Sequence, residues 1–202
     1  MGHSFGGLIT QILLDRGLGL AGVAIATAPV KGIFFLPLST WKASFPALSN
    51  PANNHRAVPL TPEQFHYAFT NTLPEEESLA VYQRYAVPGP DHILFQAAWA
   101  NFNPNAPTTA NFHNEDRAPL LLIAGGKDHI SPPAVVQANY DLYRRSRAVT
   151  EYAEFPERTP YTLGDTGWEA VADYALSWAE SHIRDASLAR AVFSIYSTGN
   201  HT

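Results

Sequence analysis

The chain has 202 residues, which is enough for one globular domain with a sizeable core. Its formal net charge is -5 and its basic residues are scattered, so neither a nucleic acid nor a membrane is expected as a partner. It contains no cysteine, which excludes disulfides, thiolate catalysis and cysteine-bound metals. No apolar run approaches the roughly 18 residues needed to cross a bilayer, and no export signal opens the chain, so a cytoplasmic protein is expected.

The chain opens with a tight-turn motif. Residues 2–6 read GHSFG, the pattern G-x-S-x-G, in which small residues allow a sharp strand-to-helix turn that exposes the serine hydroxyl. The apolar run over residues 6–14 predicts a buried helix after it. Only Met1 precedes the motif, so no entering strand is expected. Residues 19–30, bounded by glycine and proline, predict a strand buried on both faces of a parallel sheet.

Residues 31–116 differ in character from the rest, because they are rich in proline, asparagine and aromatic side chains. Helix starts are indicated by TPEQ at residues 61–64 and by LPEE at residues 73–76, which together predict a mainly helical insertion. The three consecutive glutamates at 75–77 fit the first turn of a helix, where the helix dipole favours carboxylates.

Two further strands and two helices are predicted after the insertion. Residues 120–124 and 149–155 have the apolar or β-branched composition of strands, and residues 134–145 between them have helical spacing. This order implies a right-handed parallel crossover. An amphipathic helix is predicted from Asp165 or Thr166 to about Ile183, followed by a frayed helix and a disordered end.

These motifs resemble the α/β-hydrolase superfamily of the lidded, esterase-like kind, over about residues 1–184. The resemblance implies an α/β protein with part of the α/β-hydrolase fold, in which parallel strands are flanked by helices. It divides the chain into a core at 1–30 and 117–184, a helical lid insertion at 31–116 and a C-terminal tail at 185–202.

The resemblance also implies a set of catalytic residues. In this family the nucleophile, the acid and the histidine follow one another along the chain, and the acid lies in the loop after the strand that follows the lid. This order assigns Ser4 as nucleophile and Asp128 as acid, with the backbone N–H of Phe5 as one oxyanion-hole donor. A turn-shaping or helix-capping role for Asp128 remains an alternative.

The histidine position of the family holds a proline. Relatives carry a stretch like F-P-x-R-[ST]-H after the last core strand, whereas residues 155–160 here read FPERTP. Pro160 offers neither a side-chain proton acceptor nor a backbone donor, so it cannot be the general base. His129 adjoins the acid but needs a turn to reach Ser4, and His182 is expected to be exposed or dipole-stabilised near the end of the last helix.

The other histidines offer no stronger base. His3 is expected to have a packing role beside the nucleophile. The rest lie in the insertion or in the tail: His55, His66, His92, His113 and His201. No pair has metal-ligand spacing, so neither a metal nor another cofactor is expected.

The activity that the resemblance implies is hydrolysis of a carboxylic ester or a related small acyl substrate. Complete members have about five strands before the elbow, and one of their loops supplies the second oxyanion donor. We therefore predict a truncated and impaired serine hydrolase. The alternative is a non-catalytic remnant that binds through the aromatic insertion or self-associates through the strand at residues 23–26, whose edge is expected to lack the elbow strand.

Overall fold

A single parallel sheet organises the computed structural model, which describes the backbone of residues 1–198 and the side chains of residues 1–184. Its four strands lie side by side in chain order: β1 (Gly2–His3), β2 (Gly22–Ile25), β3 (Leu120–Gly125) and β4 (Thr150–Phe155). The predicted α/β class and the three predicted strands are confirmed. Parallel strands place all their carboxyl ends on one edge of the sheet, and the loops after β1, β3 and β4 therefore emerge on the same side.

The motif at the start of the chain does have an entering strand. β1 pairs with β2 in parallel, with Gly2 opposite Ala24 and His3 opposite Ile25. The backbone N–H of Ser4 then donates to the carbonyl oxygen of Ile25 at 2.9 Å and continues the ladder. The expectation of no entering strand was therefore wrong, because two residues suffice to extend the pairing. β2 has neighbours on both sides, and the open edge of the sheet lies at β1.

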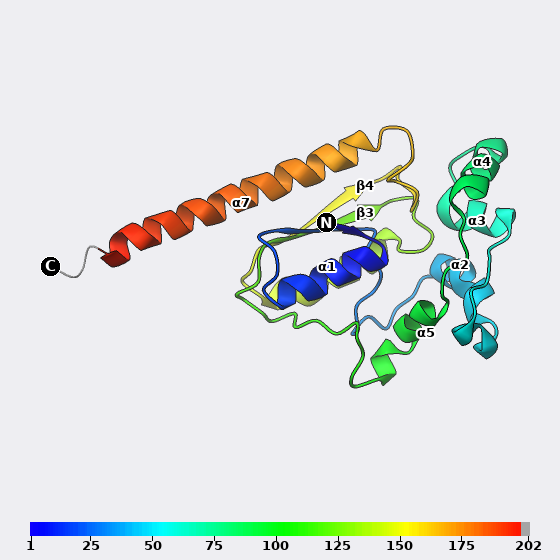
Figure 1. Cartoon of the computed structure of the whole chain (residues 1–202), viewed down its shortest axis with the longest axis horizontal. Coiled ribbons are helices and arrows are strands. Elements are labelled where there is room, and N and C mark those ends of the chain that lie inside the picture. Colours follow the sequence, from blue (N-terminus) through cyan, green and yellow to red (C-terminus); the bar gives the residue numbers. More distant parts are fainter. Residues whose placement is uncertain (199–202) are drawn as a thin grey trace.

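Helices cover both faces of the sheet. Side chains alternate along each strand, so successive residues enter opposite cores. One face packs against α1 (Phe5–Asp15) and α6 (Pro133–Leu142), which is followed by the short 3₁₀ helix η3 (Tyr143–Arg145), and the other packs against α7 (Glu169–Thr198). Figure 1 shows α1 and α7 on opposite sides of the strands. The core residues of the α7 face are Val23, Ile25, Leu121, Ile123, Val171, Ala175 and Trp178.

The last helix differs from its prediction at both ends. It begins at Glu169 because Gly167 has a φ of 75°, a left-handed conformation that an α-helix cannot contain. It continues to Thr198, well beyond Ile183, and Figure 1 shows it projecting past the sheet. The backbone of residues 185–198 is thus helical, while the predicted disordered end at 199–202 lies outside the described residues.

The insertion, residues 31–116, is mainly helical. It contains α2 (Leu38–Leu48), α3 (Pro62–Phe69), α4 (Glu75–Tyr85) and α5 (His92–Ala98), with the 3₁₀ helices η1 (Pro51–His55) and η2 (Ala100–Phe102). Both predicted helix starts occur: Thr61 and Gln64 form a capping box on α3, and α4 begins with its three glutamates. In the described part of the chain, no helix is long and apolar enough to cross a membrane.

Candidate active site

Ser4 occupies a strained turn between β1 and α1. Its backbone angles are φ 54° and ψ -120°, and a positive φ is uncommon for a residue with a side chain. The turn is held by its own carbonyl oxygen, which accepts hydrogen bonds from Gly7 N at 2.9 Å and Ala28 N at 3.0 Å. The surrounding backbone therefore fixes Ser4 at the N-terminus of α1.

The first glycine of the motif is required by close contact. A Cβ on Gly2 would lie 2.0 Å from the carbonyl oxygen of Gly6 and 2.7 Å from the hydroxyl of Thr10. A Cβ on Gly6 would meet nothing within 4 Å. The motif suggests that both glycines serve the turn, whereas the structure supplies a steric reason only for Gly2.

Gly2→Ala is therefore expected to destabilise the protein by about 2 kcal/mol, because the added carbon overlaps main-chain atoms that cannot move aside freely. Gly6→Ala is the matched control, and it should stabilise the protein by about 0.5 to 1 kcal/mol because alanine is the better residue within a helix. Urea unfolding of the two variants measures both effects. Equal stabilities for the two variants would contradict this account of the turn.

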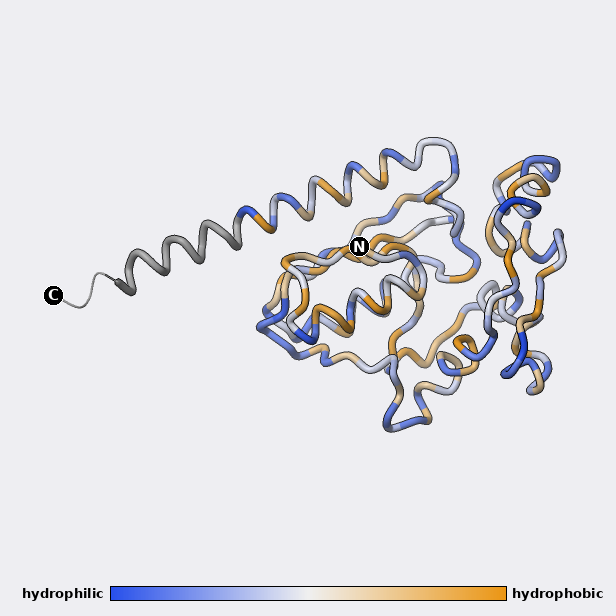
Figure 2. Tube along the Cα trace, in the orientation of Figure 1, coloured by the Kyte–Doolittle hydropathy of each residue, from blue (hydrophilic) through white to orange (hydrophobic). Residues whose placement is uncertain are grey.

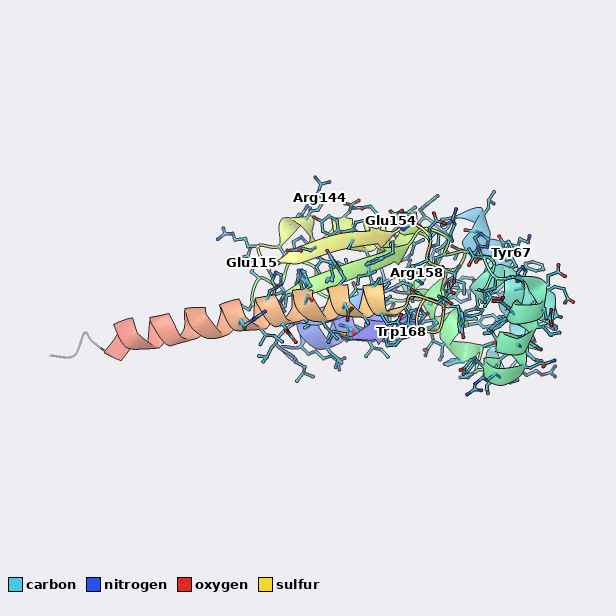
Figure 3. The ribbon with its side chains drawn as sticks, turned by 90° about the horizontal axis from the view of Figure 1, so that it is seen from above. Tyr67, Glu115, Arg144, Glu154, Arg158 and Trp168 are labelled. Carbon is cyan, nitrogen blue, oxygen red and sulfur yellow. The ribbon has the colours of Figure 1, made fainter. Side chains whose placement is uncertain are left out.

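The loop after β3 carries Asp128 and is joined to the loop after β4. Lys127 N donates to Arg158 O at 2.9 Å, and a Cβ on Gly126 would lie 2.2 Å from the carbonyl oxygen of Pro156. Arg158 in turn donates through its guanidinium to the carbonyl oxygens of Thr166 and Gly167. Figure 3 shows Arg158 between the sheet and the insertion. The two loops therefore form one layer at the carboxyl edge of the sheet.

Asp128 is buried and only one of its oxygens is paired. Asp128 is only 2% exposed, and its Oδ1 accepts hydrogen bonds from Ile130 N at 2.7 Å and Ser131 N at 2.6 Å. Its Oδ2 is buried without a hydrogen-bond partner among the described residues. Burial raises the pKa of Asp128 to about 6, although the hydrogen bonds from Ser131 and Ile130 oppose this shift. Oδ1 thus holds the turn, while Oδ2 can accept a hydrogen bond from a further donor.

Pro160 is buried in the loop after β4, close to the elbow. Its backbone carbonyl lies beside the ring of His3, the residue before Ser4. Burial lowers the pKa of His3, and the Pro160 carbonyl opposes that shift. The Nε2 of His3 is buried and has no hydrogen-bond partner within the described residues. Position 160 thus lies beside the residue that precedes Ser4, and Arg158, two residues earlier in the same loop, is hydrogen-bonded to Lys127, the neighbour of Asp128.

His129 is turned toward the insertion and away from its neighbour Asp128. Its Nδ1 lies 2.7 Å from the carbonyl oxygen of Tyr67, and its ring packs at a tilt against the Tyr67 ring, with centroids 4.5 Å apart. Its Nε2 lies 3.5 Å from the Nδ2 of Asn71. Both ring nitrogens therefore contact the insertion, which leaves no free nitrogen for Ser4.

His182 lies on the sheet face that α7 covers. Its ring stacks on Trp178 with centroids 4.1 Å apart, and its Nε2 lies 3.6 Å from Oε1 of Glu151 on β4. Its side chain is 19% exposed. The expectation of an exposed or dipole-stabilised histidine near a helix end was wrong, because α7 continues for four further turns and packs this residue against β4.

The insertion is hydrogen-bonded to the loops after β3 and β4, and no sequence pattern predicted these contacts. The Thr40 hydroxyl donates to Ile130 O at 2.9 Å, and Asn71 Nδ2 donates to Lys127 O at 3.2 Å. Tyr161 N donates to the carbonyl oxygen of Phe69 at 3.2 Å. Each contact joins residues that are far apart in the chain through a common polar group. Nothing in the local sequence marks these groups as partners, so only the folded structure reveals the contacts.

One cavity of the described structure lies apart from these residues. It has a volume of about 790 Å³ and lies between the segment after β2, α2 and the α5–η2 region. Ser4, Phe5 and Asp128 are not among its lining residues. We name it the insertion cavity. A ligand in the insertion cavity would therefore not be in contact with Ser4, Phe5 or Asp128 through the cavity walls.

Solved structures share this fold, although the sequence matches no protein-family model and no curated protein significantly. A monoacylglycerol lipase of Paleococcus ferrophilus aligns with 90% of this chain and 67% of its own, at 18% identity and a TM-score of 0.54. A Mycobacterium tuberculosis protein, provisionally described as a non-heme bromoperoxidase, aligns over 90% and 66%, at 18% identity and a TM-score of 0.58. A soluble variant of the monoglyceride lipase of Saccharomyces cerevisiae aligns over 90% and 61%, at 14% identity and a TM-score of 0.54.

The similarity is one of fold over part of the relatives' length. The chain spans about two thirds of the length of these structures, with 67%, 66% and 61% of the three chains covered. In fold, therefore, the chain is similar to part of these lipase and esterase structures, and it corresponds to about two thirds of their length.

Proposed function

We propose that this chain carries the nucleophile and the acid of a serine hydrolase acting on carboxylic esters or related acyl substrates. Ser4 is the nucleophile, Asp128 is the acid and the N–H of Phe5 is one oxyanion donor. The observation that supports this most strongly is the strained φ of Ser4 at a strand-to-helix turn. The unpaired buried oxygen of Asp128 is a second, independent support, because buried polar atoms without partners cluster at functional sites.

The reaction would begin with attack of the Ser4 oxygen on the acyl carbon, and its proton must pass to a base. Because Phe5 opens α1, its N–H has no acceptor within the helix and can face the developing oxyanion. Pro160 cannot take the proton, so water must do so. Loss of a triad histidine lowers turnover by on the order of 10⁶, or about 8 kcal/mol of transition-state stabilisation. We therefore propose a strongly impaired enzyme.

Covalent labelling at Ser4 tests this proposal. On prolonged incubation with a fluorophosphonate, the protein is expected to gain one phosphonyl group, which peptide mass spectrometry should locate at Ser4. Ser4→Ala should abolish the adduct, whereas Ser39→Ala, the matched control in α2, should retain it. Absence of a Ser4 adduct both in the natural sequence and in Pro160→His would overturn the proposal.

A non-catalytic, self-associating module is the second candidate. The outer edge of β1 has no strand beside it in the described sheet, and nearby apolar side chains are exposed: Met1 by 61%, and Ile9 and Leu13 of α1 by 53% and 39%. An open strand edge with apolar surface favours pairing with another chain. Light scattering over a concentration series should then show a mass that rises above that of one chain, and a constant monomer mass at high concentration would exclude this candidate.

A further inference from the structure

The insertion cavity has the dimensions of a small-molecule site. Its volume of about 790 Å³ falls within the range of roughly 300 to 1,000 Å³ that is usual for ligand pockets. Its walls come from separate segments of the chain: residues 29–36 after β2, α2, α5 with η2, and residues 101–107. A half-open hollow lined by several segments suits a compact ligand better than the flat surface of a second protein.

The cavity walls carry no carboxylate, lysine or arginine. Aspartate, glutamate, lysine and arginine are all absent from the residues that line it. Burying a charged group there would leave it without a partner, which costs far more than burying a neutral one. The absence of basic side chains also gives an anionic lipid surface nothing to bind. The composition of the walls therefore selects for a neutral ligand.

Most polar groups in the walls are already paired within the protein. Asn101 accepts from Gly32 N at 2.7 Å and donates to Ile33 O at 2.6 Å. The Thr40 hydroxyl donates to the carbonyl oxygen of Ile130, as described above. Ser44 and Gln96, by contrast, make no side-chain hydrogen bond with any part of the chain whose side chains are described. These two can each form a hydrogen bond with a ligand.

Four aromatic residues around the cavity remain exposed. Phe34 is 79% exposed, Trp41 52%, Trp99 62% and Phe102 76%. Figure 2 shows hydrophobic residues on the segment after β2 and on neighbouring α5. Aromatic side chains left in water around a hollow gain free energy when a ligand covers them. A ligand bound in the cavity would cover these side chains, and this role accounts for their exposure.

We infer that the insertion cavity binds a neutral, apolar or aromatic small molecule, with no contribution from Ser4. The volume selects a compact ligand, the walls contain no carboxylate, lysine or arginine, and Ser44 and Gln96 offer polar groups for contact with the ligand. This inference does not depend on the proposed hydrolase activity, since none of Ser4, Phe5 and Asp128 lines the cavity.

Titration with the neutral fluorophore N-phenyl-1-naphthylamine tests the inference on the full chain. We expect saturable binding of one probe per chain, with energy transfer from tryptophan because Trp41 and Trp99 line the cavity. Ser44→Phe fills the hollow and should weaken binding at least about tenfold. Ser39→Phe is the matched control, because it makes the same substitution in α2 away from the cavity, and it should bind as the natural sequence does.

Two further measurements show whether the probe binds in the insertion cavity and whether binding requires a neutral ligand. Ser4→Ala should bind the probe unchanged, and the anionic 8-anilinonaphthalene-1-sulfonate should bind at least about tenfold more weakly than the neutral probe. Circular dichroism spectra should confirm that each variant is folded. The inference would be overturned if the probe did not bind saturably, or if folded Ser44→Phe and Ser39→Phe bound it with equal affinity. It would also be overturned if binding were lost as the protein self-associates.

Discussion

Pro160→His is expected to raise kcat/KM for p-nitrophenyl acetate at least about 100-fold over the natural sequence. A positioned general base contributes typically 10² to 10⁴ in rate. Position 160 lies beside the residue before Ser4, and the loop that carries it is hydrogen-bonded to the loop of Asp128. The new imidazole would find an acceptor in the unpaired Oδ2 of Asp128. The Asp128 carboxylate can then orient the ring and stabilise its protonated form.

Pro160→Ala is the matched control for this gain. It removes the proline ring without adding a base, so its rate should stay within about threefold of the natural sequence. A similar gain in both variants would show that loop relaxation, rather than proton transfer, is responsible. The gain in Pro160→His should also increase with pH through the titration of the imidazole, because only its neutral form accepts a proton.

Asp128→Asn is expected to gain stability relative to the natural sequence as the pH rises. Burial raises the pKa of Asp128 from 3.8 to about 6, so between these values the folded protein holds a proton that the unfolded chain has lost. The natural protein therefore loses stability from about pH 4 to pH 6. At 1.36 kcal/mol for each pKa unit, the loss amounts to about 3 kcal/mol.

The asparagine variant has no such proton to lose, yet its carbonyl oxygen can still accept the hydrogen bonds from Ile130 and Ser131. Its stability advantage should therefore grow by up to about 3 kcal/mol between pH 4 and pH 7, measured by urea unfolding. Asp116→Asn alters an exposed carboxylate and should change stability by less than about 0.5 kcal/mol at either pH. A constant difference between Asp128→Asn and the natural sequence across this range would contradict the raised pKa of the buried Asp128 carboxyl group.

The sequence predicted the buried strands well because their residues are apolar throughout. β3 is buried at every position, so its composition alone distinguishes it. β1 could not be predicted, because two residues carry no periodicity and their pairing with β2 is a tertiary contact. The start of α7 was missed for a different reason: the left-handed φ of Gly167 is a property of the turn and cannot be read from a glycine alone.

The candidate site was predictable in its order but not in its contacts. The positions of Ser4 and Asp128 along the chain followed from a family resemblance, and the structure places both at loops on the carboxyl edge of the sheet. The unpaired oxygen of Asp128, and the contact of Pro160 with His3, arise only when distant loops meet. The turn of His129 toward Tyr67 likewise depends on the insertion. These contacts are long-range, and the local sequence does not encode them.

The central claim is that positions 4, 128 and 160 form one catalytic site, and a double-mutant cycle on ester hydrolysis tests it most directly. Asp128→Asn should lower kcat/KM for p-nitrophenyl acetate at least about 100-fold when Pro160→His is present, and less than about threefold when Pro160 is retained. Ser4→Ala should abolish the gained activity of Pro160→His. Equal effects of Asp128→Asn in the two backgrounds would show that Asp128 and residue 160 do not act together, and would contradict the account.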